Sequence, residues 1–110
     1  MEFEKFYLIM LKDGPLEDPE SEEELTQARQ AHLDYQSSLH NNHGAVAGPL
    51  RGERGDIQGI TLVPERELSL EQASALAEGD PAVQAGYLSV QVVEWHVGRG
   101  LVELHAWQGE

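Results

Sequence analysis

The sequence predicts one α+β domain, in which an antiparallel sheet of four strands carries two helices on one face. The chain has 110 residues, which gives room for a single core-forming domain. Its apolar residues make up 40% of the chain and fall into short periodic segments of strand or helix length. These segments follow the order strand, helix, strand, strand, helix, strand, which is typical of two interleaved β-α-β units.

The first strand and the first helix have clear local signals. Residues Phe3–Leu11 are apolar on both alternating faces, which predicts a central strand. After a loop with two prolines, a helix is predicted over residues 22–40, or to 42 at most. Ser21 and Glu24 match the capping-box pattern, and acidic residues in the first turn suit the positive end of the helix dipole. Gly44 is expected to form the left-handed cap at the other end.

A hairpin is predicted next. Residues Ala45–Leu50 and Ile57–Val63 read as two strands, and the glycine-containing segment 51–56 between them reads as their turn. Together with the first strand, these segments supply three strands of the sheet.

The second helix and the last strand complete the pattern. Ser69 and Gln72 match a second capping box, with Leu68 at the position of a hydrophobic staple. The alanine-rich segment that follows predicts a helix to Glu78, and Tyr87–Val97 is predicted as the fourth strand. The whole order is that of a ferredoxin-like βαββαβ domain, because right-handed crossovers place both helices on one face.

Two further expectations concern the sheet and the chain end. The first strand is also apolar on the face that no helix covers, which predicts a homodimer that packs sheet against sheet. We assign residues 1–98 to the domain and 99–110 to a C-terminal extension. Alternation within Arg99–Trp107 predicts either an added edge strand or a swapped arm.

Composition excludes several classes of partner. The net charge is −13 and the seven Lys and Arg residues form no basic stripe, so we expect no nucleic-acid or membrane binding. The chain has no cysteine, no apolar stretch of membrane-spanning length and no signal-peptide pattern at its start. We therefore expect a cytoplasmic protein.

Two titratable residues occupy unusual places. His32 lies within the apolar stripe of the first helix, which the spacing directs toward the sheet; the stripe comprises Leu25, Ala28, His32, Tyr35 and Leu39. Taken alone, His32 fits a core histidine bonded to a backbone carbonyl or water. Asp80 precedes Pro81, which predicts the N-cap of a short helical turn. A functional interpretation needs His32 to have a partner, and Asp80 and Arg29 are the candidates.

Several short motifs in order make the chain resemble the YCII-related (YciI-like) family. These are Arg29–Leu33, Ala47–Pro49, Ala77–Pro81, Ala85–Gly86 and Trp95. The resemblance implies a dimeric α/β barrel fold and an active site of His and Asp, which here are His32 and Asp80. Most members have no assigned reaction, but one branch resembles enzymes that eliminate HCl from a chlorinated hydroxyquinol, and muconolactone isomerase shares the wider fold. The chain departs from the pattern at Ala82, where an aromatic residue usually stands, and in its longer tail.

Within that resemblance, we expect cofactor-independent acid/base chemistry, of elimination or isomerisation type, on a small aromatic or enol-type molecule. His32 would carry the proton, since the unperturbed imidazole pKa of about 6.5 is close to neutral pH. Asp80 would orient the ring and Arg29 would hold an anionic group. The alternatives are a non-catalytic dimeric module that binds or senses a metabolite, and a structural subunit without a pocket.

Other histidines suggest a metal site only weakly. His40 and His43 lie one turn apart and would need His96 or His105 to complete a ligand set, but no H-E-x-x-H pattern or carboxylate cluster accompanies them. Patterns for a serine nucleophile or a phosphate-binding loop do not occur. We expect no metal and no cofactor.

Overall fold

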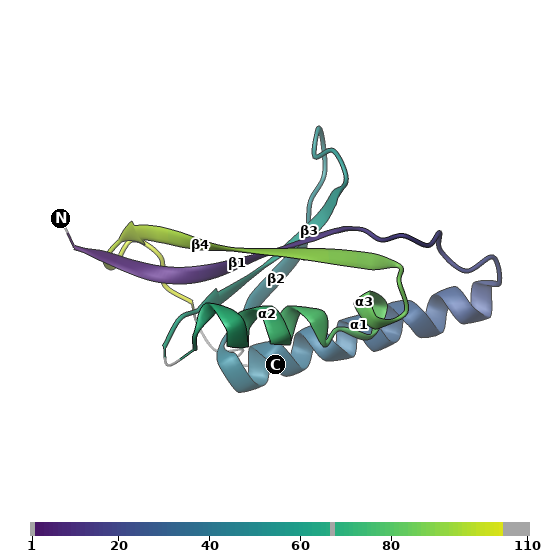
Figure 1. Cartoon of the computed structure of the whole chain (residues 1–110), viewed down its shortest axis with the longest axis horizontal. Helices are drawn as coiled ribbons and strands as arrows, with labels where there is room; N and C mark the ends of the chain where they lie inside the picture. Colours follow the sequence, from purple (N-terminus) through teal and green to yellow (C-terminus); the bar gives the residue numbers. More distant parts are fainter. Residues whose placement is uncertain (1, 67, 105–110) are drawn as a thin grey trace, which may run out of the picture.

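The computed structural model describes residues 2–66 and 68–104, and it has the predicted order of elements. They are β1 (Phe3–Asp13), α1 (Glu22–His43), β2 (Val46–Pro49), β3 (Ile57–Pro64), α2 (Leu70–Glu78), the one-turn helix α3 (Pro81–Gln84) and β4 (Leu88–Gly98). The sheet order is β2-β3-β1-β4, and every neighbouring pair is antiparallel. Both long helices lie on one side of this sheet (Figure 1). The ferredoxin-like α+β prediction is therefore confirmed.

Local capping sets the bounds of α1. The Ser21 hydroxyl accepts a hydrogen bond from the Glu24 N–H at 3.3 Å, as the capping pattern predicts. At the other end Gly44 has φ 70°, and its N–H donates to the His40 carbonyl at 2.9 Å. Because the glycine is the first residue to leave the helix, α1 ends at His43, one residue beyond the predicted limit.

Capping also explains the junction of α2 and α3. Ser69 and Gln72 form both halves of a capping box, so α2 begins where the sequence predicts. After α2 the chain bends at Gly79, and Asp80 then caps α3 with Pro81 at its first position. Asp80 is thus placed by two short helices that meet end to end.

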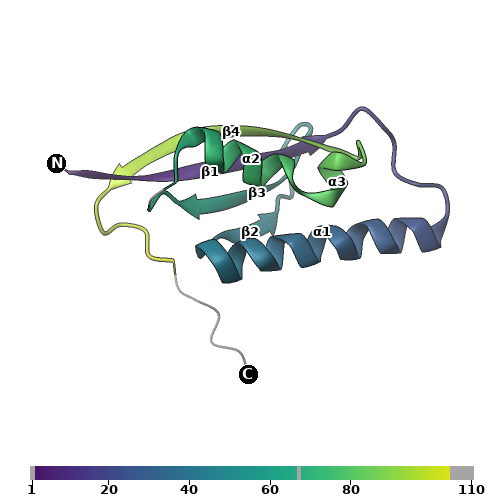
Figure 2. The ribbon, with the colours of Figure 1, turned by 60° about the horizontal axis from the view of Figure 1, so that its bottom comes forward.

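The core lies between the sheet and α2. Its buried members are Tyr7, Ile9, Leu11, Leu39, Ala45, Val63, Ala73 and Ala77. Small alanines on α2 let that helix approach the sheet closely. Leu39 is the one fully buried residue of α1, so the C-terminal part of this long helix joins the core. The N-terminal part of α1 lies beside α3 instead (Figure 2).

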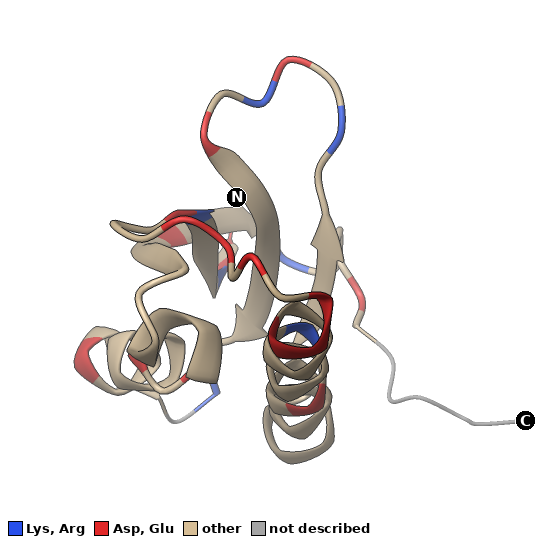
Figure 3. Cartoon of the chain, turned by 90° about the vertical axis from the view of Figure 1, so that its right-hand side faces the viewer, with Lys and Arg blue, Asp and Glu red and all other residues tan. Residues whose placement is uncertain are grey.

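The other sheet face carries no helix among the described residues (Figures 1 and 3). Strand alternation and register place apolar side chains there, and seven of them are Phe6, Leu8, Met10, Ile60, Leu62, Val93 and Trp95. The rings of Phe6 and Trp95 are 6.3 Å apart, and Trp95 remains 42% exposed. We call these seven residues the open apolar face.

The segment after β4 adds no strand to the sheet within the described residues, and the alternative of a swapped arm stays a prediction. Residues 99–104 form a turn and a loop. Gly100 has φ 81°, and the Leu101 N–H donates to the Gly98 carbonyl at 3.1 Å, which turns the chain out of the extended path. Residues 105–107 of the predicted segment lie outside the described residues. No described helix has the length and apolar character needed to cross a membrane.

Candidate active site

Asp80 and His32 are in direct contact. The His32 Nδ1 lies 2.6 Å from Asp80 Oδ2, and the Gln36 amide donates to the same oxygen at 3.0 Å. The other oxygen, Oδ1, accepts from the Ala82 N–H at 2.9 Å and caps α3. The two interpretations of Asp80, as helix cap and as partner of His32, therefore both hold, because each uses a different oxygen.

The surroundings of Asp80 favour its anionic form. The residue is only 1% exposed, and such burial alone would raise the pKa of its carboxyl. The hydrogen bonds from His32, the Ala82 N–H and Gln36 outweigh burial and hold the pKa of Asp80 below its ordinary value. Since an ionised carboxylate only accepts, the imidazole donates through Nδ1–H.

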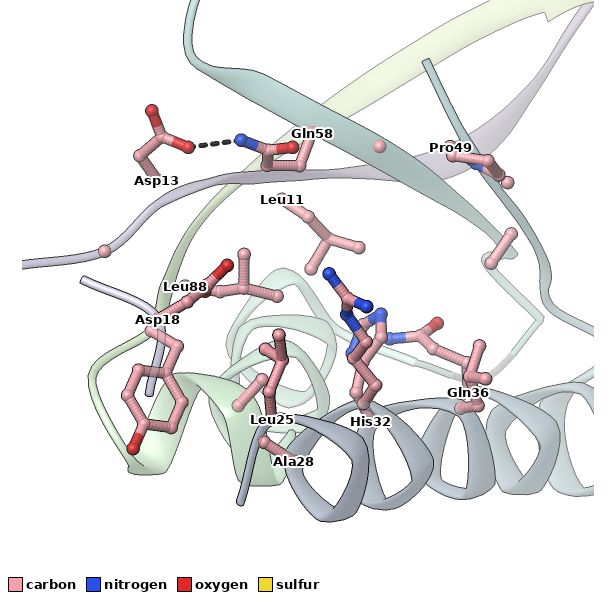
Figure 4. Close-up of a pocket in the computed structure, with 18 of the residues that line it drawn as sticks. Leu11, Asp13, Asp18, Leu25, Ala28, His32, Gln36, Pro49, Gln58 and Leu88 are labelled. Atoms are coloured by element: carbon pink, nitrogen blue, oxygen red, sulfur yellow. Dashed lines mark hydrogen bonds between the residues drawn. The ribbon is translucent and has the colours of Figure 1, made fainter. Parts of the chain in front are cut away.

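His32 links this carboxylate to a cavity. Its side chain is 23% exposed and lines the cavity wall formed by α1 (Figure 4). Within residues 2–66 and 68–104, its Nε2 has no hydrogen-bond partner. With Nδ1 protonated and bonded to Asp80, Nε2 carries a lone pair that can accept a proton from a molecule in the cavity.

The cavity has a volume of about 1440 Å³ and is open to solvent. Its walls are α1, the segment between β1 and α1, and parts of β2, β3 and the start of β4. The lining is mainly apolar and includes Leu11, Leu25, Ala28 and Leu88 (Figure 4), together with Ala82. This composition suits a small molecule with an apolar body and few polar groups.

Charge at the cavity is uneven. Acidic residues gather on the segment that precedes α1 and on its first turn (Figure 3), and Asp13, Glu17 and Asp18 contribute to the lining. Arg29 is the one Lys or Arg among the described lining residues. It is exposed and forms no ion pair within the described part of the chain. Arg29, one turn before His32, is therefore the group that can attract an anionic oxygen.

Sequence reasoning missed two polar residues behind the pair. Gln36 donates to Asp80, and its own oxygen accepts from the Thr61 hydroxyl at 2.9 Å. Gln36 lies one turn after His32, so helical spacing could have found it. Thr61 could not be found in this way, because threonine is common in strands. Only the structure shows that its side chain is fully buried.

The other histidines that the structure describes do not form a cluster. His40 Nδ1 lies 2.8 Å from the Ala45 carbonyl, and His96 is an exposed neighbour of Glu94 on β4. Over the described ranges, no three His, Cys, Asp or Glu side chains are placed to hold a metal ion together. His105 lies outside those ranges.

Three comparisons with known proteins bear on the family of this chain. A search of curated proteins found no match. Among solved structures, the chain is similar to 5-chloro-2-hydroxyhydroquinone dehydrochlorinase from Burkholderia phenoliruptrix, in complex with 2,5-dihydroxybenzoquinone. The two share 29% identity with a TM-score of 0.57, and the alignment covers 86% of this chain and 96% of the other. The family model of the YCII-related domain matches residues 6–96, and the chain therefore belongs to the YCII-related family.

Proposed function

We propose that this protein is a cofactor-independent enzyme in which His32 and Asp80 carry out acid/base chemistry on a small hydroxylated aromatic or enol-type molecule. The observation that carries the proposal is the 2.6 Å contact between His32 Nδ1 and the buried Asp80 carboxylate at the wall of a cavity. Such a pair holds the imidazole in one tautomer and stabilises the imidazolium that forms when Nε2 takes a proton.

Elimination of HCl is the reaction type that we favour. The step starts from the keto tautomer of the substrate, in which a hydroxyl proton has moved to the ring carbon that carries chlorine. Nε2 of His32 then accepts the proton of a second hydroxyl, whose O–H electron pair forms a C=O bond and shifts the ring double bond, so that the carbon–chlorine bond breaks and chloride leaves. For a chlorinated trihydroxybenzene, loss of H⁺ and Cl⁻ leaves a hydroxyquinone, so no external oxidant is needed. The similarity to a dehydrochlorinase supports this class. Isomerisation would use the same base and return the proton to another carbon.

The cavity lining supports an aromatic substrate. Leu11, Leu25 and Leu88 offer apolar surfaces against which a flat ring can pack (Figure 4). Arg29 would bind a phenolate or quinone oxygen and so orient the ring toward His32. Replacing Arg29 by Gln is expected to raise KM more than it lowers kcat, because the contact serves the ground state and the transition state alike.

The assembly that we propose is a homodimer formed through the open apolar face. A contiguous apolar patch on a sheet is costly to leave in water and is a common mark of an interface. Sedimentation of the purified chain at micromolar concentration would test this assembly directly. A monomer under those conditions would contradict it.

Substitution of His32 tests the enzyme proposal. The wild-type chain is mixed with 5-chloro-2-hydroxyhydroquinone, and chloride release is followed; His32→Ala is expected to lower the rate about 10²- to 10⁴-fold. His96→Ala removes an exposed histidine of β4 and serves as the matched control. Wild-type protein that binds 2,5-dihydroxybenzoquinone yet releases no chloride would contradict the proposed elimination and favour a binding module.

A further inference from the structure

A second layer of polar groups lies behind the His32 and Asp80 pair. The Gln36 side chain bridges from Asp80 Oδ2, 3.0 Å away, to the hydroxyl of Thr61, 2.9 Å away. Thr61 is fully buried and sits on β3 directly opposite Ile9 of the central strand β1. The bridge therefore connects helix α1 and the start of α3 with the middle of the sheet.

We propose that Gln36 and Thr61 are positioning residues, which fix the Asp80 carboxylate so that His32 is held with its proton on Nδ1. This inference rests on the proposed function only where turnover is concerned, because the tautomer of His32 can be measured without a substrate. Neither residue is assigned a chemical step of its own.

The orientation of the Gln36 amide is the first part of the argument. Its NH₂ group must face the anionic Oδ2, and its oxygen must face a donor. Thr61 supplies that donor from a site with no exposed surface. If the amide were flipped, its oxygen would oppose the carboxylate oxygen and the hydrogen bond to Asp80 would be lost. The anionic Asp80 oxygen thus sets the orientation of the amide, and the buried Thr61 hydroxyl anchors the amide in that orientation.

The orientation of the carboxylate is the second part. Asp80 is held by the Ala82 N–H at one oxygen and by Gln36 and His32 at the other. Without Gln36, only the Ala82 N–H and the His32 imidazole would hold the carboxylate. The carboxylate could then rotate more freely about its terminal torsion. The Gln36 hydrogen bond also contributes to the low pKa of Asp80. Loss of the bridge should therefore loosen His32 and raise the pKa of Asp80.

Nitrogen and carbon NMR of the ligand-free chain test the proposal. The ¹⁵N shifts of the His32 ring report which nitrogen is protonated, and the ¹³C shift of the Asp80 carboxyl reports its titration. In Gln36→Leu we expect the Asp80 midpoint to rise by about one pH unit and the His32 ring to populate both tautomers. Thr61→Val should produce the same changes to a smaller extent, and Thr61→Ser should restore the wild-type spectra.

Gln30 provides a matched control. It lies on the exposed side of α1 and donates to Asp34 at 2.8 Å, so Gln30→Leu removes a glutamine–aspartate bond from the same helix without touching the site. Its His32 spectrum should match wild type. If Gln36→Leu fails to fold, the Thr61→Val and Thr61→Ser pair still decides the question.

The outcomes separate this inference from the proposed function. A folded Thr61→Val or Gln36→Leu protein with wild-type His32 tautomer and Asp80 midpoint would overturn the inference, whatever the activity. The expected spectral changes in a chain that releases no chloride would support the inference and count against the proposed elimination. In an active chain, the variants should lower kcat about tenfold or more with little change in KM, and Thr61→Ser should recover it.

Discussion

Replacing Asp80 by asparagine should reverse the tautomer of His32 while the fold persists. The change keeps an oxygen for the Ala82 N–H, and asparagine is a good N-cap, so α3 should survive. It also places an NH₂ group where Oδ2 accepted from His32 and Gln36. The imidazole can respond by turning Nδ1 into an acceptor, which moves its proton to Nε2. Gln36 can flip its amide as well, because the Thr61 hydroxyl both donates and accepts.

The expected magnitudes follow from this rearrangement. Since every buried donor can still find an acceptor, Asp80→Asn should cost only about 1–2 kcal/mol of unfolding free energy. Asp80→Ala leaves the donors of His32, Gln36 and Ala82 without the carboxylate, and should cost about 3–5 kcal/mol. Catalysis should behave differently, because a wrong tautomer removes the base; the rate with Asn should fall about 10³- to 10⁴-fold.

Three measurements on the same samples test the reasoning. Urea unfolding gives the stability difference, ¹⁵N NMR gives the His32 tautomer, and chloride release gives the rate. An Asp80→Asn protein that keeps Nδ1 protonated and turns over at the wild-type rate would refute the role given to the carboxylate. Equal stability losses for Asn and Ala would refute the rearranged hydrogen bonds.

Three further predictions concern stability and assembly. The pKa of Asp80 is lower in the folded state than in the unfolded state, where it is about 3.9. The ionised carboxylate therefore stabilises the fold fully above the unfolded pKa, and this stabilisation is lost as pH falls through the folded pKa. In urea unfolding, the free energy of unfolding should fall across this acid range in the wild type, and the part of this fall that is due to Asp80 should be absent in Asp80→Asn. A Cβ at Gly79 would lie 2.5 Å from the Tyr35 hydroxyl, so Gly79→Ala should lose about 1–3 kcal/mol, and Tyr35→Phe should recover part of it in thermal melts. Leu62→Lys on the open apolar face should yield monomers in sedimentation, whereas Leu101→Lys, at a 76% exposed position in the loop after β4, should not.

Most of the fold could be predicted because its signals are local. Ser21, Gly44 and the Ser69 capping box mark helix ends through contacts within four residues, and the structure has helix ends at these places. The placement of both helices on one face of the sheet followed from general rules about crossovers. The segment after Val97 was harder to predict. Its alternating apolar residues favour a strand, whereas Gly100 favours a turn, and the alternation alone does not show which structure forms.

The site was harder to predict because its contacts are long-range. His32 and Asp80 are 48 positions apart, and only the family resemblance joined them before the structure was known. Gln36 and Thr61 belong to no motif that was recognised. A helix register and a strand register must both be known before their side chains can be seen to meet. Hydrogen bonds between distant elements leave no mark in local periodicity.

The double use of Asp80 ties the site to the stability of the domain. One oxygen holds the first turn of α3 and the other holds His32, so a movement of α3 would change the direction of the imidazole. The junction is further fixed by the Tyr35 hydroxyl, which donates to the Leu76 carbonyl at 2.7 Å near the end of α2. The donors from Ala82, Gln36 and His32 offset the cost of burying the Asp80 carboxylate and hold it in place. The carboxylate therefore need not reorganise when a proton reaches His32. Rigidity at this helix junction is thus what would allow an open cavity to present one defined base.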